Sequence, residues 1–92
     1  GIVGRTYASR QCQMVDDAAG DPDFTGAIDR VTGFRTVSMI STPLLTAQGP
    51  IGVLQAVNKR GPSRFDLEDR NLLRALASPL ALAAANASMA RS

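Results

Sequence analysis

The side chains that could carry out chemistry are few in this sequence, and the missing types restrict its function. The chain contains no histidine and one cysteine, Cys12. It therefore has no Ser-His-Asp triad, no Cys/His zinc site and no internal disulfide. No lysine or histidine neighbours Cys12 in the sequence to activate it. We expect Cys12 to be a small buried apolar residue in a reducing compartment, the cytoplasm, rather than a reactive thiol.

The charged side chains are unevenly distributed along the chain. The net charge is +2, yet no acidic residue lies between Asp29 and Asp66. Five basic residues lie in or beside that interval: Arg30, Arg35, Lys59, Arg60 and Arg64. Nucleic-acid surfaces combine clustered basic residues with interleaved aromatics, whereas aromatics make up only 4% of this chain and tryptophan is absent. We expect no nucleic-acid partner, and a small anionic ligand would use the same positive bias equally well.

Length and composition predict one folded domain. A chain of 92 residues buries about 60–65% of its unfolded surface, and 45% hydrophobic content disfavours disorder. No apolar run reaches the roughly 18–20 residues of a membrane span, and the first residues do not show the basic, apolar and small-residue order that is typical of a signal peptide. The chain opens on Gly1 without an initiator methionine. We therefore expect it to be part of a longer protein.

The first third of the chain predicts two helices and a short strand. Apolar residues near a 3.6-residue repeat indicate a helix over residues 1–9, and alternation indicates a strand over residues 11–15. Asp21 followed by Pro22 is typical of a helix start, with Asp21 as the N-cap and Gly33 as the end. The apolar side of this second helix would comprise Phe24, Ala27, Ile28 and Val31.

The central part of the chain predicts an antiparallel hairpin. Residues 35–45 and 51–58 are rich in β-branched side chains, and the turn sequence at residues 46–50 separates them. In the second strand, Gly52 and Ala56 lie on one face, where their small side chains suit the close approach of a helix. A loop containing Gly61-Pro62-Ser63 is expected to follow.

The last predicted element is a long helix over residues 67–90. Asp66 is its expected N-cap, Asp69 lies in the first turn, and alanine-rich sequence should carry the helix through Pro79. Its predicted apolar stripe comprises Leu72, Leu73, Leu76, Leu80, Ala84 and Ala87. The element order gives an α+β fold with an antiparallel sheet and a long closing helix. Three strands and one long helix make a thin core, so further chain or a partner should cover part of it.

Four segments carry a recognisable family pattern. They are the glycine-framed helix start Gly1–Arg5, the stretch Asp29–Thr36, the strand Pro50–Lys59, and Asn58-Lys59 with Phe65 and Asp69. In this order and spacing they resemble a GAF domain, a sensory and regulatory module of cyclic-nucleotide phosphodiesterases, adenylyl cyclases and bacterial signalling proteins. The resemblance implies short helices on one face of the sheet and the long C-terminal helix on the other. Residues 1–92 then form a partial GAF domain that lacks the family's N-terminal helix and first strands.

Departures from the family pattern narrow the expected function. The final Glu of the family's N-K-F-D-E pattern is Arg70 here, which weakens a match to the phosphodiesterase type in particular. Some relatives reduce free methionine sulfoxide with several cysteines, and others attach a bilin beside a Cys-His pair. One cysteine and no histidine disfavour both chemistries. We expect no catalytic activity and no cofactor.

Six residues are candidates for contact with a ligand. Backbone amides at the helix start, here Ile2 and Val3, hold a phosphate in the family, since an N-terminal helix end favours an anion. Side chains at the mouth of a pocket can bond a ribose or a base edge, and Asp29, Thr32 and Thr36 match positions that contact cyclic nucleotide in the binding members. Gln55 occupies a strand position that can face the pocket, and a buried glutamine needs hydrogen-bond partners. A purely structural role stays open for each: Ile2 and Val3 as packing residues, Thr32 as a helix end, Thr36 as a strand residue.

Four further residues match a structural motif. In the family, the Lys and Asp of this motif pair and fix a strand end to the closing helix, which implies that Lys59 and Asp69 pair here. Phe65 is expected to fill the core, and Asn58 completes the motif.

The leading hypothesis is a sensor module of a larger signalling protein. It would bind a small molecule, with a cyclic nucleotide as the candidate that the resemblance supplies, and pass a signal through its last helix to an output domain. The alternative is a ligand-free module for dimerisation. In both cases we expect a homodimer, because the strand Ile51–Asn58 would present an open edge and the helix Leu67–Ala90 an uncovered apolar face.

Overall fold

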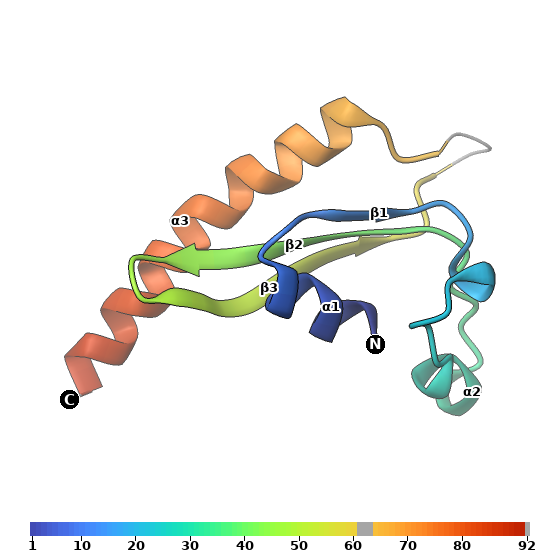
Figure 1. Cartoon of the computed structure of the whole chain (residues 1–92), viewed down its shortest axis with the longest axis horizontal. Helices are drawn as coiled ribbons and strands as arrows, with labels where there is room; N and C mark the ends of the chain where they lie inside the picture. Colours follow the sequence, from blue (N-terminus) through green and yellow to red (C-terminus); the bar gives the residue numbers. More distant parts are fainter. Residues whose placement is uncertain (61–63, 92) are drawn as a thin grey trace.

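The polypeptide forms a three-stranded antiparallel sheet with helices on both faces (Figure 1). The computed structural model describes residues 1–60 and 64–91. In chain order the elements are α1 (Ile2–Ser9), β1 (Gln13–Val15), a 3₁₀ turn (Ala18–Gly20), α2 (Ala27–Thr32), β2 (Met39–Thr46), β3 (Gly49–Val57) and α3 (Leu67–Arg91). The predicted α+β class is confirmed, and the predicted loop at Gly61-Pro62-Ser63 lies outside the described residues.

β2 is the central strand of the sheet. It pairs antiparallel with β1 and with β3, so that Ser41 lies opposite Gln13 on one side and Gln55 on the other. α1 packs against one face of β2 and β3, and α3 packs against the opposite face (Figure 1). Successive residues of a strand point to opposite faces. Ser41 is therefore directed toward α1, and Thr42 toward α3.

The hairpin of β2 and β3 forms as predicted, but β2 starts later and β3 starts two residues earlier than the sequence pattern indicated. Ala47 and Gln48 make the turn, which Gly49 closes at a φ of 115° that favours glycine. β2 begins at Met39 rather than residue 35 because the backbone groups of residues 35–38 bond mainly to the side chains of Asp29 and Asn58 and to the Ala18 amide instead of a neighbouring strand. The Asn58 Oδ1 atom accepts hydrogen bonds from the amides of residues 37 and 38, at 2.8 and 3.2 Å, and its Nδ2 atom donates to the residue 35 carbonyl at 2.8 Å.

α2 is shorter than predicted, and its sequence-based start is wrong. Asp21 does not cap a helix: its carboxylate accepts hydrogen bonds from Arg5 and from the Asp23 amide. The helix begins only at Ala27, after Gly26 in the left-handed region, and ends at Gly33 as predicted. Its expected apolar side is also wrong, since Ile28 and Val31 are 75% and 87% exposed. Of that set, Phe24, which precedes the helix, packs against the core.

The core on the α1 face is small. Its buried members are Ile2, Val15, Ala18 and Met39, and Phe24 packs against them. They come from α1, β1, the 3₁₀ turn and β2. Each of these elements contributes one buried apolar side chain, so the contacts between elements carry the stability of this half of the molecule.

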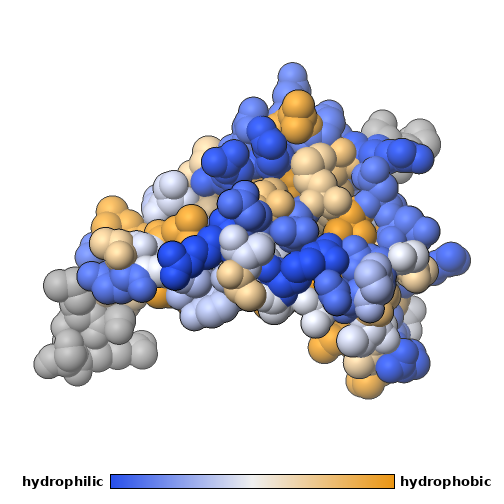
Figure 2. Space-filling view, viewed as in Figure 1, coloured by the Kyte–Doolittle hydropathy of each residue, from blue (hydrophilic) through white to orange (hydrophobic). Residues whose placement is uncertain are grey.

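α3 continues through Pro79 as predicted, but the phase of its buried stripe differs from the prediction. The buried residues are Leu73, Ala77 and Ala81, four positions apart, so the small alanines let the helix lie close to the sheet. Leu72, Leu76 and Leu80 are instead exposed. Figure 2 shows apolar surface of this kind along α3 and around α2. In the part of the chain that the structure describes, no helix is long and apolar enough to cross a membrane.

Candidate functional site

Two of the six predicted ligand residues, Asp29 and Thr36, contact each other. Asp29 lies in the first turn of α2, and its carboxylate accepts hydrogen bonds from the Thr36 amide at 2.6 Å and the Thr36 hydroxyl at 2.9 Å. Thr36 is buried. The pair closes the segment between α2 and β2, so its carboxylate already has two partners before any ligand is present.

Thr32 serves the end of α2. Its hydroxyl donates to the Ile28 carbonyl at 2.9 Å and accepts from the Phe34 amide at 3.3 Å. Both bonds are local, and the side chain is exposed. These contacts support a structural role for Thr32 at the helix end, which the sequence left open as the alternative to ligand contact.

Gln55 belongs to a buried polar network between the sheet and α1. Its Nε2 atom donates to the Ser41 hydroxyl at 3.3 Å, and the Ser41 and Thr6 hydroxyls lie 3.0 Å apart. The Thr6 hydroxyl also donates to the Ile2 carbonyl at 2.8 Å. Thr6 and Ser41 are both 0% exposed. A consistent order of donors runs from Gln55 through Ser41 and Thr6 to Ile2, which satisfies all three side chains.

Ile2 and Val3 begin α1. Ile2 is buried in the core, whereas Val3 is about half exposed. Gly1 is the N-cap, without a side-chain hydrogen bond, and the first helical bond runs from the Arg5 amide to the Gly1 carbonyl at 3.0 Å. The side chain of Ile2 therefore packs. The use of the first amides by a phosphate stays a prediction.

An ion pair that the sequence did not reveal fixes α1 to the loop before α2. Arg5 donates two hydrogen bonds to the Asp21 carboxylate and one to Asp23, each at 2.9 Å. The Arg5 guanidinium holds the pKa of Asp21 below its ordinary value, and hydrogen bonds to Asp21 and Asp23 raise the pKa of Arg5. The partners are 16 and 18 positions apart. No helix or strand period joins such positions, and this is why the pattern concealed the pair.

The predicted contact between Lys59 and Asp69 is present. The Lys59 ammonium lies 2.6 Å from the Asp69 carboxylate and 3.4 Å from that of Asp66. The two aspartates also form a reciprocal cap, in which each backbone amide donates to the other's side chain at 2.8 and 2.9 Å. These contacts lower the pKa of Asp69 and raise that of Lys59. They fasten the end of β3 to the start of α3.

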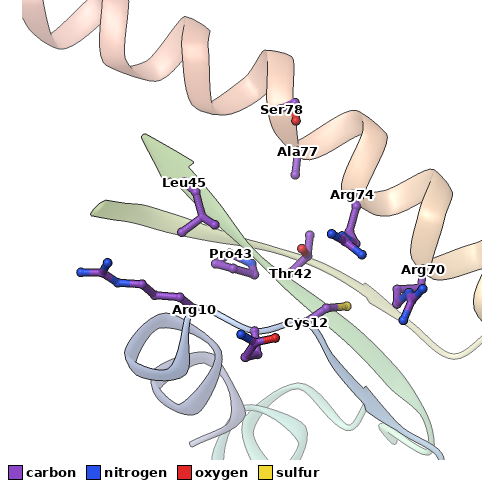
Figure 3. A pocket seen from close by; sticks show the side chains of 10 residues that line it. Arg10, Cys12, Thr42, Pro43, Leu45, Arg70, Arg74, Ala77 and Ser78 are labelled. Atoms are coloured by element: carbon purple, nitrogen blue, oxygen red, sulfur yellow. The ribbon is translucent and has the colours of Figure 1, made fainter. Parts of the chain in front are cut away.

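A cavity of about 280 Å³ lies on the other face of the sheet, under α3 (Figure 3). None of the six predicted ligand residues lines it. Within the described residues, no group of three or more His, Cys, Asp or Glu side chains could hold a metal ion. The predicted ligand residues thus lie on the α1 side as separate hydrogen-bonded pairs and networks, not around this cavity.

The sequence pattern of the GAF domain matches residues 1–84 of this chain. The chain belongs to the GAF domain family. A dual 3′,5′-cyclic-AMP and -GMP phosphodiesterase 11A from Takifugu rubripes is 34% identical over 70 residues, which are 75% of this chain and 8% of that protein. The chain therefore corresponds to a small part of that relative.

Two solved structures share the fold of this chain. A crystal structure of a Burkholderia vietnamiensis protein, described as a GAF sensor, is 36% identical to this chain and has a TM-score of 0.65. The match covers 84% of this chain and 46% of the Burkholderia chain. A fragment of a methyl-accepting chemotaxis protein has a TM-score of 0.80 at 21% identity. The match covers 100% of this chain and 58% of the chemotaxis-protein chain. The second likeness concerns the fold alone. The chain spans about half of each of these structures.

Proposed function

We propose that this chain is the small-molecule-binding regulatory part of a signalling protein. The observation that carries the proposal is membership of the GAF family over residues 1–84, because GAF domains are commonly small-molecule-sensing, non-catalytic modules. The Burkholderia protein described as a GAF sensor supports it. We further propose that the chain acts in the cytoplasm and that a separate output domain reads its state.

The proposed ligand site lies on the α1 side of the sheet, between the start of α1 and α2. Gln55 contributes a polar group from β3, and the Asp29–Thr36 pair sets the position of α2. The exposed apolar side chains of α2, Ile28 and Val31, supply apolar surface that a ligand or further polypeptide would cover. A cyclic nucleotide is the first ligand to test, because the phosphodiesterase relative acts on cyclic AMP and cyclic GMP.

The proposed output is a movement of α3. Lys59 and Asp69 connect the end of β3 to the first turn of α3, and Leu73 and Ala77 lie in the buried stripe that faces the sheet. A ligand that alters the sheet on the α1 side would shift the packing of α3 only if it binds one arrangement more tightly than the other. The Lys59–Asp69 ion pair keeps the start of α3 close to the end of β3, so a shift of the strand is carried into the helix.

Calorimetric titration with cyclic AMP and with cyclic GMP tests the proposal. If either binds, Thr36→Ala should weaken it by about 0.5–1.5 kcal/mol, since one hydrogen-bonding hydroxyl is removed. Thr25→Ala, an exposed threonine in the segment before α2, is the matched control and should bind as the wild type does. Equal binding by wild type and Thr36→Ala would remove Thr36 from the site.

A ligand-free dimerisation module is the second candidate function. The observation that favours it is the exposure of Leu72, Leu76 and Leu80 on α3. β3 has β2 on one side and, within the described residues, no strand on the other. A homodimer that uses α3 for much of its interface would cover both surfaces. This module would retain no small molecule and would still associate.

A further inference from the structure

The cavity under α3 lies between that helix and the β1 side of the sheet. Its walls include Cys12 beside β1, Thr42 on β2, and Arg70, Arg74 and Ala77 on α3 (Figure 3). Thr42 follows Ser41 in β2, and Ser41 contacts Thr6 of α1, so the two neighbours face opposite sides of the sheet. The cavity is therefore separate from the ligand site proposed above.

The cavity is positively charged. Arg70 and Arg74 lie one helical turn apart and point from α3 toward Thr42 and Cys12 (Figure 3). No acidic residue lines the cavity. Within residues 1–60 and 64–91, neither arginine makes an ion pair with an acidic side chain. Two uncompensated guanidinium groups are thus directed at one concave surface.

Arg70 has an unused donor. Its Nε atom is buried and has no hydrogen-bond partner among the described residues, and its Nη2 atom reaches only the Asn71 side chain, at 3.4 Å. Leaving a buried donor of a charged group unpaired is costly, so such a group commonly has a partner in the functional state.

The thiol in the wall does not offset this charge. Burial raises the pKa of Cys12, although the charges of Arg70 and Arg74 act in the opposite direction. Cys12 is therefore protonated and neutral near pH 7. The cavity then presents the guanidinium groups of Arg70 and Arg74 together with the Thr42 hydroxyl and the neutral Cys12 thiol, and a third arginine, Arg10, also lines it.

We propose that this cavity binds a small phosphate-bearing molecule, held by the guanidinium groups of Arg70 and Arg74 and by the Thr42 hydroxyl. A phosphate has enough oxygens to accept hydrogen bonds from both planar guanidinium groups at once. The bound anion would join α3 to the β1–β2 side of the sheet. It would act as a second effector on the same helix, independently of whether the α1-side site binds a ligand.

Titration with inorganic phosphate at constant ionic strength tests the proposal, with the arginine Nε–H signals followed by NMR. Saturable shifts are expected for Arg70 and Arg74. Arg70→Gln and Arg74→Gln should each weaken binding about tenfold, as expected for a lost charge-assisted hydrogen bond. Arg35→Gln removes the same charge from an exposed position outside the cavity and should leave binding unchanged. A linear response, or equal weakening by Arg35→Gln, would overturn the proposal.

A second measurement uses Cys12, the only cysteine of the 92 residues. Phosphate at saturation should slow the alkylation of Cys12 by iodoacetamide in the wild type, and much less in Arg70→Gln. This readout does not depend on the NMR signals of the substituted residue. Alkylation that phosphate leaves unchanged contradicts the proposal. Protection that grows with protein concentration without phosphate also contradicts it, because a second copy would then cover the cavity.

Discussion

At the scale of single residues, the polar side chains on the α1 side mainly satisfy one another. Asp29 bonds to Thr36, and Gln55 joins Ser41 and Thr6. Asp29, Thr36 and Gln55 could be predicted because each stands in a family motif. Thr6 and Ser41 could not, because 35 positions separate them and neither period of secondary structure relates them. A ligand on this side must therefore add to existing bonds or replace them.

The buried Thr6–Ser41 contact predicts a non-additive pair of substitutions. Thr6→Val leaves the Ser41 hydroxyl without one of its partners and should reduce the free energy of unfolding by about 1–3 kcal/mol. The double variant Thr6→Val/Ser41→Ala should lose less than the sum of the single variants, because both partners of the bond are removed together. Urea unfolding of the four proteins measures this. Strict additivity would mean that the two hydroxyls do not interact.

At the scale of elements, the sequence predicts the identity of helices and strands better than their faces. The β2–β3 hairpin follows from its β-branched strands and its turn residues. The start of α2 was predicted too early because Asp21 has a stronger partner in Arg5 than in a helix N-terminus. The buried stripe of α3 was assigned to leucines, but Ala77 and Ala81 face the sheet since small side chains permit close packing. Periodicity cannot decide between two stripes that are both apolar.

Two adjacent leucines test the phase of α3. Leu73→Ala removes a buried side chain and should cost about 2–5 kcal/mol of unfolding free energy. Leu72→Ala changes an exposed side chain, 64% accessible, and should change stability by no more than about 0.5 kcal/mol. Thermal and urea unfolding compare the two variants. The opposite ranking would mean that the side of α3 with Leu72, Leu76 and Leu80 packs on the sheet instead.

The ion pair between Lys59, at the end of β3, and Asp69 of α3 should stabilise the fold in a pH-dependent way. A double-mutant cycle with Lys59→Met and Asp69→Asn should show a favourable interaction at pH 7. The pKa of Asp69 is below its ordinary value of 3.8, so its contribution is present above that pH and is lost as the pH falls through the lower, folded-state value. Ligand affinity should hardly change. Additive effects at pH 7 in denaturant melts would show that the contact contributes nothing to stability.

At the scale of the whole molecule, the main feature is a strand edge and an apolar helix face that no other described residues cover. β3 forms an edge of the described sheet, and Leu76 and Leu80 of α3 are exposed. The two solved structures compared above are longer than this chain, which covers 46% of one and 58% of the other. Either more chain or a second copy can cover these surfaces. The exposed α2 residues could not be predicted, because an amphipathic pattern does not tell whether its covering surface is present.

Association follows from these surfaces. We predict at least a homodimer of the 9.7 kDa chain, with α3 in much of the interface, because pairing buries the exposed leucines and closes the β3 edge. Sedimentation equilibrium at micromolar concentration measures the mass. Leu76→Glu should shift the equilibrium toward monomer, since it places a charge in the proposed interface. A well-folded monomer in the wild type is the result that would exclude the dimer.

The central claim is that this GAF chain binds a small molecule. The most direct measurement offers cell extract to the purified protein and identifies the retained compounds by mass spectrometry, with Thr36→Ala and Thr25→Ala treated in parallel. The account predicts one reproducible compound, retained by the wild type and Thr25→Ala and depleted in Thr36→Ala. Retention that Arg70→Gln alone abolishes would assign the compound to the cavity under α3. Repeated empty preparations, with a stable dimer present, would contradict the claim and favour the ligand-free module.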